Sequence, residues 1–241
     1  MYLSLLKSLI SKDSLISESQ IKYLINKAKN SSQVKLEIIP LNKLNSWSYK
    51  NGSLIHESNN FFKIKGIDVS INKGLRKWSQ PIIYQPEVGI LGLIATEIRG
   101  VMHFLIQLKV EPGNINFIQL SPTIQATRSN YLSAHKGKSV PFLELFRTIS
   151  PFSKIIVDQL QSEQGSRFLG KRNRNIIIYL DEPPEVPDNE KFIWLTLNQI
   201  KKLSREDNLV NMDLRTVISC LDFSQVPNNI FENYLVKENL S

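Results

Sequence analysis

One stretch of alternating residues constrains the fold of this chain more than any other feature of its sequence. Between residues 103 and 111 one side of an extended chain is apolar and the other is polar: Phe104, Ile106, Leu108 and Val110 against His103, Gln107, Lys109 and Glu111. Such a period of two predicts a β-strand. Pro112-Gly113-Asn114 then predicts a turn, followed by a returning strand from Ile115 to Leu120. The segment after it, up to Lys138, carries more hydrogen-bonding side chains than a fold needs, so it is a candidate for function.

The rest of the sequence predicts short strands and a few helices. Ser17 and Gln20 predict the capped start of an amphipathic helix. Further strands are predicted over 34–39, 61–71, 82–85, 93–98, 155–160 and 176–180, and further helices from Pro141 to before Ser150, over 197–204 and over 212–221. Strands joined by short turns indicate antiparallel pairing rather than βαβ units. We therefore expect one α+β domain over residues 1–241, with a mixed, mainly antiparallel, curved sheet and flanking helices; residues 1–33 form an N-terminal helical extension.

Composition narrows the class of protein. The single cysteine, Cys220, excludes an internal disulfide and a cysteine-based zinc site, and it suits a reducing cytoplasm. No window is long and apolar enough to cross a membrane, and the first ten residues are too short and interrupted for a signal peptide. We therefore expect a cytoplasmic protein without a membrane partner.

The net charge of +8 comes from 30 Lys and Arg against 22 Asp and Glu. An anionic partner and a solvated basic surface both fit this excess. Nucleic acid would require a dense basic stripe with interleaved aromatic residues, and the sequence contains none. We therefore do not expect a nucleic-acid partner.

Several motifs, in consistent order over about residues 34 to 222, resemble the NDP-4-keto-6-deoxyhexose 2,3-dehydratases of deoxysugar biosynthesis. They are Trp78-x-Gln80-Pro81, Gln85-x-Glu87-x-Gly89-Ile90-Leu91-Gly92, His103-Phe104-Leu105-x-Gln107-x-Lys109-x-Glu111-Pro112-Gly113-Asn114, Gln119-x-Ser121-Pro122-Thr123-x-Gln125-Ala126-Thr127-x-Ser129-Asn130-Tyr131, Ser162-Glu163-Gln164-Gly165, Lys171-Arg172-Asn173-Arg174-Asn175, Trp194-x-Thr196-Leu197 and Asn211-Met212-Asp213-x-Arg215-Thr216-Val217.

The resemblance implies a fold distantly similar to the Nudix hydrolases and a dehydratase that uses no cofactor and no metal. The familiar members are about twice as long and contain two related modules, whereas this sequence resembles one module. The resemblance therefore implies either a homodimer or a separate partner. The Nudix box of metal-dependent pyrophosphohydrolases is absent from the sequence.

The implied reaction acts on a nucleotide-linked 4-keto sugar, by family habit dTDP-4-keto-6-deoxyglucose, and gives a 3,4-diketo-2,6-dideoxy sugar. It needs a base at C3, a donor to the C4 oxygen and an acid for the departing C2 hydroxyl. The catalytic candidates are Glu163, His103, Lys109, Tyr131 and His135. Lys109 is the expected donor, and the choice of base stays open between Glu163 and His103.

Substrate-binding candidates follow from the same resemblance. A pyrophosphate suits the basic residues Arg167, Lys171, Arg172 and Arg174, assisted by Arg128. Base, ribose and sugar hydroxyls suit Gln107, Gln119, Thr123, Gln125, Thr127 and Asn130, and Trp78 is either a stacking platform or a core residue. Each of these residues also has an ordinary structural reading, as solvated basic rim, self-capping turn or core.

Two functions from different classes follow. The first is a 2,3-dehydratase working as a homodimer, upstream of a 3-ketoreductase that consumes its unstable product. The second is a non-catalytic module that binds the nucleotide sugar and completes the site of a partner subunit.

Overall fold

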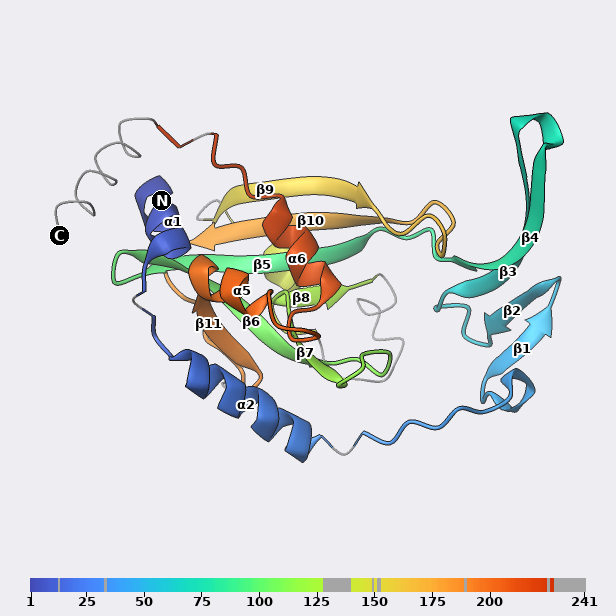
Figure 1. Ribbon diagram of the computed structural model, residues 1–241, viewed down its shortest axis with the longest axis horizontal. Coiled ribbons are helices and arrows are strands. Elements are labelled where there is room, and N and C mark those ends of the chain that lie inside the picture. The colour runs from blue at the N-terminus through green and yellow to red at the C-terminus, as the bar shows by residue number, and fades with distance from the viewer. Residues whose placement is uncertain are drawn as a thin grey trace.

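The computed structural model describes residues 1–227 apart from residues 13, 33, 128–139, 149, 151–152, 189 and 225. Two sheets are built from these residues (Figure 1). The larger has the strand order β11-β6-β5-β10-β9, with β7 paired to β6 and β8 paired to β5. Its strands are β5 (Gly89–Ile98), β6 (Val101–Val110), β7 (Ile118–Ser121), β8 (Ile124–Ala126), β9 (Ser153–Ser162), β10 (Arg172–Leu180) and β11 (Phe192–Thr196).

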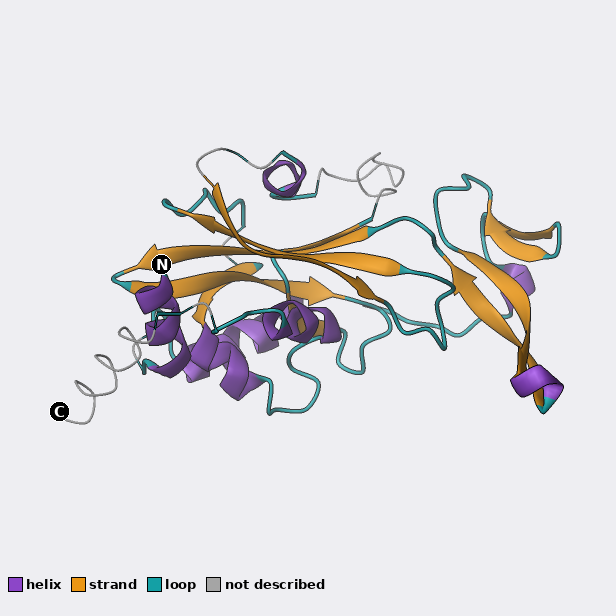
Figure 2. Ribbon diagram, turned by 90° about the horizontal axis from the view of Figure 1, so that it is seen from above, coloured by secondary structure: helices purple, strands orange, loops and turns teal. Residues whose placement is uncertain are grey.

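Four helices cover one face of the larger sheet: α1 (Tyr2–Ile10), α2 (Glu18–Ser31), α5 (Leu197–Leu203) and α6 (Met212–Ser219). Figure 2 shows these helices gathered beneath the strands. Capping boxes start α2 at Ser17 and α5 at Thr196, so both helices begin where a side chain satisfies their first backbone N–H groups.

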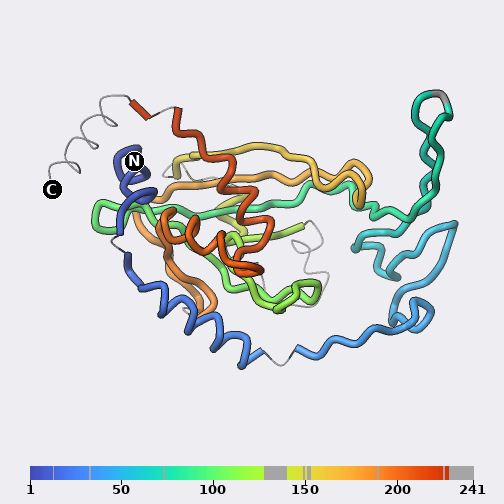
Figure 3. Tube along the Cα trace, viewed as in Figure 1, coloured from blue at the N-terminus to red at the C-terminus, as the bar shows by residue number. Residues whose placement is uncertain are grey.

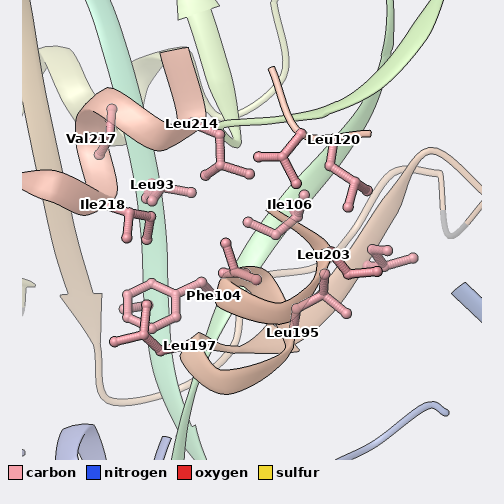
Figure 4. Close-up of a cluster of buried hydrophobic side chains, with 14 of the residues drawn as sticks. Leu93, Phe104, Ile106, Leu120, Leu195, Leu197, Leu203, Leu214, Val217 and Ile218 are labelled. Atoms are coloured by element: carbon pink, nitrogen blue, oxygen red, sulfur yellow. The ribbon is translucent and has the colours of Figure 1, made fainter. Parts of the chain in front are cut away.

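The main core lies between these helices and the sheet (Figure 4). The close-up shows side chains from the strands, such as Leu93, Phe104 and Ile106, packed against Leu197 and Leu203 of α5 and Leu214, Val217 and Ile218 of α6. Phe104 and Ile106 are fully buried, as their alternation predicts, but Val110 at the end of β6 is 44% exposed. Leu5 of α1 and Ile25 of α2 also belong to this core, so the N-terminal helices pack as part of the main body.

A second core covers the opposite face of the sheet. There α4 (Leu143–Arg147) packs Leu143 and Phe146 against Leu105, Ile124 and strand residues of β10. Gly92 makes this close approach possible, because a Cβ at this position would lie 2.5 Å from the Phe146 ring. The polar side of β6 is therefore not a solvent-facing surface.

The smaller sheet has the order β1-β2-β3-β4 and projects from the main body (Figure 1). Its strands are β1 (Trp47–Lys50), β2 (Ser53–His56), β3 (Lys63–Ile71) and β4 (Arg76–Tyr84), with the short helices η1 (Leu41–Lys43) before β1 and η2 (Asn72–Gly74) between β3 and β4. Ile83 joins it to the body, since its N–H donates to the Arg167 carbonyl and its carbonyl accepts from the Leu169 N–H.

A long connection leads from α2 to this smaller sheet, as the tube in Figure 3 traces. The prediction of a strand over 34–39 is wrong, because these residues run extended without a strand partner in the described chain. Their apolar residues remain outside, and Ile38 is 92% exposed. A β pattern produces a strand only where an adjacent edge is available.

The α+β class and the mixed, mainly antiparallel sheet are confirmed, with β5 and β10 as a parallel pair. Several boundaries differ from the predictions. The returning strand begins at Ile118 rather than Ile115, and α4 begins at Leu143 because Phe142 has a φ of 62°. The helix α1 lies within the helical extension expected over residues 1–33, but the sequence patterns did not predict β1, β2, β8 or β11, each of five residues or fewer. Short elements carry too few residues for a periodic pattern.

Candidate active site in a split of the sheet

The larger sheet splits in its centre. Between Ile94 and Ile98, β5 pairs with β6, but beyond Ile94 and Leu105 the two strands diverge. There β5 takes β8 as its partner, while β6 takes β7. The connection from β7 to β8 turns at the apex of the opening. We call the space between β8 and the β6–β7 pair the sheet split.

Thr123 closes the apex of the sheet split. Its hydroxyl accepts a hydrogen bond from the Ile94 N–H at 3.0 Å and donates to the Leu105 carbonyl. These are the backbone groups at which the β5–β6 ladder ends. Thr123 is buried, so its hydroxyl replaces a rung of the ladder and defines where the split starts.

The segment that precedes α6 enters the split beside β7. The Leu120 N–H donates to the Leu209 carbonyl, and the Asn211 N–H donates to the Leu120 carbonyl. Asn211 is the N-cap of α6, and its amide also donates to Ser121 Oγ at 2.9 Å. The first turn of α6 is therefore anchored at the mouth of the split.

A chain of hydrogen bonds crosses the split. Lys109 Nζ on β6 donates to Gln125 Oε1 on β8 at 2.7 Å, and Gln125 Nε2 donates to Asp213 Oδ2 on α6. Glu111 lies 3.0 Å from the same ammonium group. The split thus collects one lysine, two carboxylates and an amide from three separate elements.

The surroundings of Asp213 raise the pKa of its carboxyl group. Burial is the largest cause, and the nearby charges of Glu111 and Glu163 raise this pKa further. The hydrogen bond from Gln125 and the charge of Lys109 act in the opposite direction. A carboxyl group in which these influences compete is typical of acid–base sites.

Glu163 lies in a small cavity on the α6 side of the split. This cavity of about 180 Å³ is lined by residues that include Glu163, Asn173 and Asp213. Glu163 accepts hydrogen bonds from Asn173 Nδ2 at 2.7 Å and from the Gln164 N–H at 3.2 Å. Gly89 leaves room for Asn173, since a Cβ there would lie 2.6 Å from its Oδ1 atom.

A larger cavity of about 740 Å³ opens on the α4 side of the split. Four of the predicted site residues line it: Gln107, Lys109, Thr123 and Gln125. Val140 and Pro141 also line it, and they directly follow the undescribed residues 128–139. The predicted site residues Arg128, Asn130, Tyr131 and His135 lie outside the described residues.

His103 lies at the opposite end of β6 from Lys109. Six residues at about 3.3 Å each separate the two by roughly 20 Å. Its Nδ1 donates to the Val101 carbonyl at 2.9 Å, its Nε2 has no hydrogen-bond partner in the described chain, and its side chain is 3% exposed. Burial lowers its pKa. The structure does not bring His103 together with Lys109 and Glu163.

The predicted basic cluster is divided by the alternation of β10. Lys171 is buried, donates to the Glu87 carbonyl at 2.6 Å, and has its pKa lowered by burial. Arg172 and Arg174 share the strand side of Ile176, which faces α4. Arg174 forms a two-pronged ion pair with Asp158, both bonds being 2.7 Å, and this pairing lowers the pKa of Asp158.

The other predicted binding residues are dispersed. Arg167 is exposed in the loop that holds Ile83. Trp78 lies on the smaller sheet, 42% exposed, and donates to Gln80 Oε1 at 2.8 Å. Gln119 is buried on β7, where it pairs with Lys109 of β6. Thr127 follows β8 and is the last described residue before the gap at 128–139.

Comparison with known proteins matches this chain to one family. The model of the family described as NDP-hexose 2,3-dehydratase matches residues 18–221. The chain belongs to this family. The resemblance stated from the motifs is thereby confirmed, and the sheet split with its lysine and carboxylates lies inside the matched region.

Curated members of the 2,3-dehydratase family are close in sequence. A protein of Amycolatopsis orientalis named dTDP-4-dehydro-6-deoxy-alpha-D-glucopyranose 2,3-dehydratase is 45% identical over 87% of this chain and 46% of its own length. A protein of the same name from Saccharopolyspora spinosa is 49% identical over 77% of this chain and 38% of its own length. The chain therefore spans less than half the length of these relatives.

Solved structures give more distant matches. RenU, a Nudix hydrolase from M. smegmatis, is 15% identical, with 64% of this chain and 96% of that chain covered at a TM-score of 0.35. The C. elegans Ap4A hydrolase is 12% identical, with 63% and 99% covered at a TM-score of 0.34. The Nudix-like part of the fold expectation stays a prediction.

Two further observations concern metals and membranes. The part of the chain that the structure describes holds no group of three or more His, Cys, Asp or Glu side chains arranged to bind a metal ion. None of its described helices has the length and apolar character needed to span a bilayer.

The sequence patterns did not single out two polar residues that the structure brings into the candidate site. They are Asp213 and Asn173, neither of which is among the candidate site residues predicted from the sequence. Both stand inside motifs that carry the family resemblance. The sequence does offer a signal for such residues. A polar residue inside a family motif that belongs to neither a periodic apolar face nor a helix cap is a candidate site residue.

Proposed function

We propose that this family member removes water across C2–C3 of a nucleotide-linked 4-keto-6-deoxyhexose, with dTDP-4-keto-6-deoxyglucose as the substrate. Membership of the 2,3-dehydratase family supports the reaction, and the names of the curated relatives support the substrate. The observation that carries the proposal is Lys109, whose ammonium is held between Gln125 and Glu111 at the edge of a large cavity.

The chemistry requires three positioned groups and balances without a redox step. A base removes the C3 proton, which the C4 carbonyl acidifies, and the electron pair moves to the C4 oxygen as an enolate. When that electron pair returns, the C2–O bond breaks, and an acid protonates the departing hydroxide to water. The resulting enol takes a proton at C2 and becomes a 3,4-diketo-2,6-dideoxy sugar.

In this proposal Lys109 donates to the C4 oxygen as it gains charge. A cation aimed at a developing oxyanion in a partly enclosed site is among the larger contributions to catalysis. Lys109 is suited to it because its side chain is held by two acceptors instead of moving freely in solvent.

Glu163 is our choice as the base at C3. Its carboxylate is fixed by Asn173 and by a backbone N–H, and it shares a cavity with Asp213. His103 is the less suitable alternative, because its Nδ1 is engaged by a backbone carbonyl at the far end of β6. Tyr131 and His135 remain proposed as further acid groups.

We propose that Arg172 and Arg174 contact the pyrophosphate on the α4 side, assisted by Arg128 and Arg167, and that Lys171 contributes its positive charge from its buried position at the Glu87 carbonyl. Arg174 would exchange Asp158 for phosphate oxygens, which its planar guanidinium binds equally well in a two-pronged manner. Trp78, Gln107, Gln119, Thr123, Gln125, Thr127 and Asn130 remain proposed contacts for the nucleoside and the sugar.

The assembly is also part of the proposal. Because the chain spans less than half of its curated relatives, we propose that two copies associate to rebuild a two-module arrangement. The enzyme would act in the cytoplasm, and a 3-ketoreductase would consume its reactive diketone.

The experiment couples the purified protein to that reductase. The protein is incubated with dTDP-4-keto-6-deoxyglucose, NADPH and a 3-ketoreductase in D₂O, and the nucleotide sugar is analysed by mass spectrometry and NMR. We expect a 2,6-dideoxy sugar with deuterium at C2, because the enol is protonated there from solvent. Glu163→Gln should reduce its formation by roughly 10²–10⁴-fold, and the reductase alone serves as control.

Bound but unchanged substrate would contradict catalysis by this chain. That result would favour the second function, a nucleotide-sugar-binding module that completes the site of a partner subunit. Adding a full-length two-module relative carrying an inactivated site would then test whether this chain restores turnover.

A further inference from the structure

We propose that Asp213 is a positioning residue that holds Lys109 in place through Gln125. The proposal deepens the dehydration proposed above and rests on it. Three contacts carry it: Lys109 to Gln125, Gln125 to Asp213, and Lys109 to Glu111.

The amide of Gln125 can satisfy both neighbours in one orientation only. Its Oε1 faces an ammonium, which can donate but not accept, and its Nε2 faces a carboxylate oxygen. Reversing the amide would place N–H against N–H and oxygen against oxygen. Asp213 thereby fixes the Gln125 amide from its Nε2 side, Asn211 Nδ2 donates to the Oε1 side at 3.5 Å, and the oriented Oε1 holds the Lys109 ammonium.

Asp213 lies in the first turn of α6, where a negative charge is favourable, but the side-chain cap of that helix does not depend on it. Asn211 already caps α6, because its Oδ1 accepts from the Leu214 N–H at 2.8 Å. The Asp213 carboxylate instead turns into the split, where Glu111 and Glu163 repel its charge. Burial beside two other carboxylates disfavours the ionised form, so this position works against stability.

The geometry leaves one lysine proton for chemistry. A lysine ammonium has three N–H donors, and among the described residues Gln125 and Glu111 use two of them. The third can point to the C4 oxygen of the sugar. A long, flexible lysine needs such anchors, since a misplacement of about 1 Å in an active site can cost roughly 100-fold in rate.

The test is a double-mutant cycle on kcat. Asp213→Asn should lower kcat by about 10- to 100-fold with little change in KM. In a Lys109→Met background the same change should have almost no further effect, because the residue acts through Lys109. Asp68→Asn is the matched control: Asp68 accepts one side-chain bond from Ser79 on the smaller sheet, and its loss should leave kcat unchanged.

Thermal unfolding separates positioning from a merely structural role. Asp213→Asn should keep or raise the Tm, because it removes a desolvated carboxylate, while kcat falls. A Tm that falls together with kcat would overturn the proposal. So would equal losses of kcat in the wild-type and Lys109→Met backgrounds.

A spectroscopic readout keeps the test independent of turnover. The ammonium resonance of Lys109 in ¹⁵N-labelled protein, assigned by its loss in Lys109→Met, should broaden in Asp213→Asn and stay sharp in Asp68→Asn. If wild-type protein turns over no substrate, the proposed function fails, and an unchanged Lys109 resonance in Asp213→Asn would separately reject the positioning role.

Discussion

The two ends of strand β6 show what the same sequence pattern becomes in two surroundings. His103 and Lys109 lie on the same side of one strand, and both belong to a motif of the 2,3-dehydratase family. At the His103 end β6 is flanked by paired strands, Thr96 of β5 and Thr196 of β11, and the ring is buried. At the Lys109 end the sheet has split, and the side chain meets Gln125 and Glu111.

The difference teaches that a polar residue on a strand acquires a functional setting where the ladder opens. In the closed part of the ladder His103 is covered by its neighbours, and burial lowers its pKa. The split instead admits side chains from β8 and α6, together with a cavity on either side. The point at which β5 and β6 stop pairing decides which polar residues of β6 meet side chains from other elements.

The largest expected effect on kcat/KM comes from substitutions at the two ends of β6. Lys109→Met should lower kcat/KM by roughly 10²–10³-fold, because a donor to the developing oxyanion is lost. His103→Gln should change kcat/KM by no more than about threefold, as expected of a residue remote from the chemistry. The coupled dehydratase assay measures both, with Lys154→Met on the edge strand β9 as the control for loss of a lysine. Equal losses at the two ends would show that β6 works as one catalytic strand and reject the contrast.

A smaller effect is expected at the apex of the split. Thr123→Val should destabilise the fold by about 2 kcal/mol, since the Ile94 N–H and the Leu105 carbonyl both lose their buried partner. Thr96→Val at the closed end is the matched control. It removes a single donor to the Leu180 carbonyl, and we expect about 1 kcal/mol. Urea unfolding provides both values, and a Thr96→Val cost equal to that of Thr123→Val would contradict a special role for the apex.

The smallest expected effect is the pH dependence of stability that His103 causes at the closed end of β6. Burial lowers the pKa of His103 in the folded state below its unfolded value, so the unfolded chain binds the proton first as pH falls. Its contribution to stability is present above about pH 6.5 and declines as pH falls toward the folded pKa. The stability difference between wild type and His103→Gln should therefore shift between pH 7.5 and pH 5, as followed by Tm. A constant difference across that range would mean that His103 is not held neutral by burial.

Much of the fold could be read from periodic patterns and caps. The alternation of β6 predicted the burial of Phe104, Ile106 and Leu108, and the capping residues Ser17 and Gln20 predicted the start of α2. These features depend on neighbours within a few residues. The family could also be read from the sequence, because its motifs are polar residues at fixed spacings.

The sequence by itself therefore determined the class of fold, the family and the identity of Lys109 and Glu163 as candidates. The tertiary structure alone decided that Gln125 bonds to both Lys109 and Asp213, the latter 88 residues further along the chain than Gln125, and that His103 joins none of them. It also separated Lys171, buried at the Glu87 carbonyl, from Arg172 and Arg174 on β10. The reason is physical: alternation assigns each residue a side of its strand, but only the pairing of distant strands decides whether that side is closed by a neighbour or opens into a split.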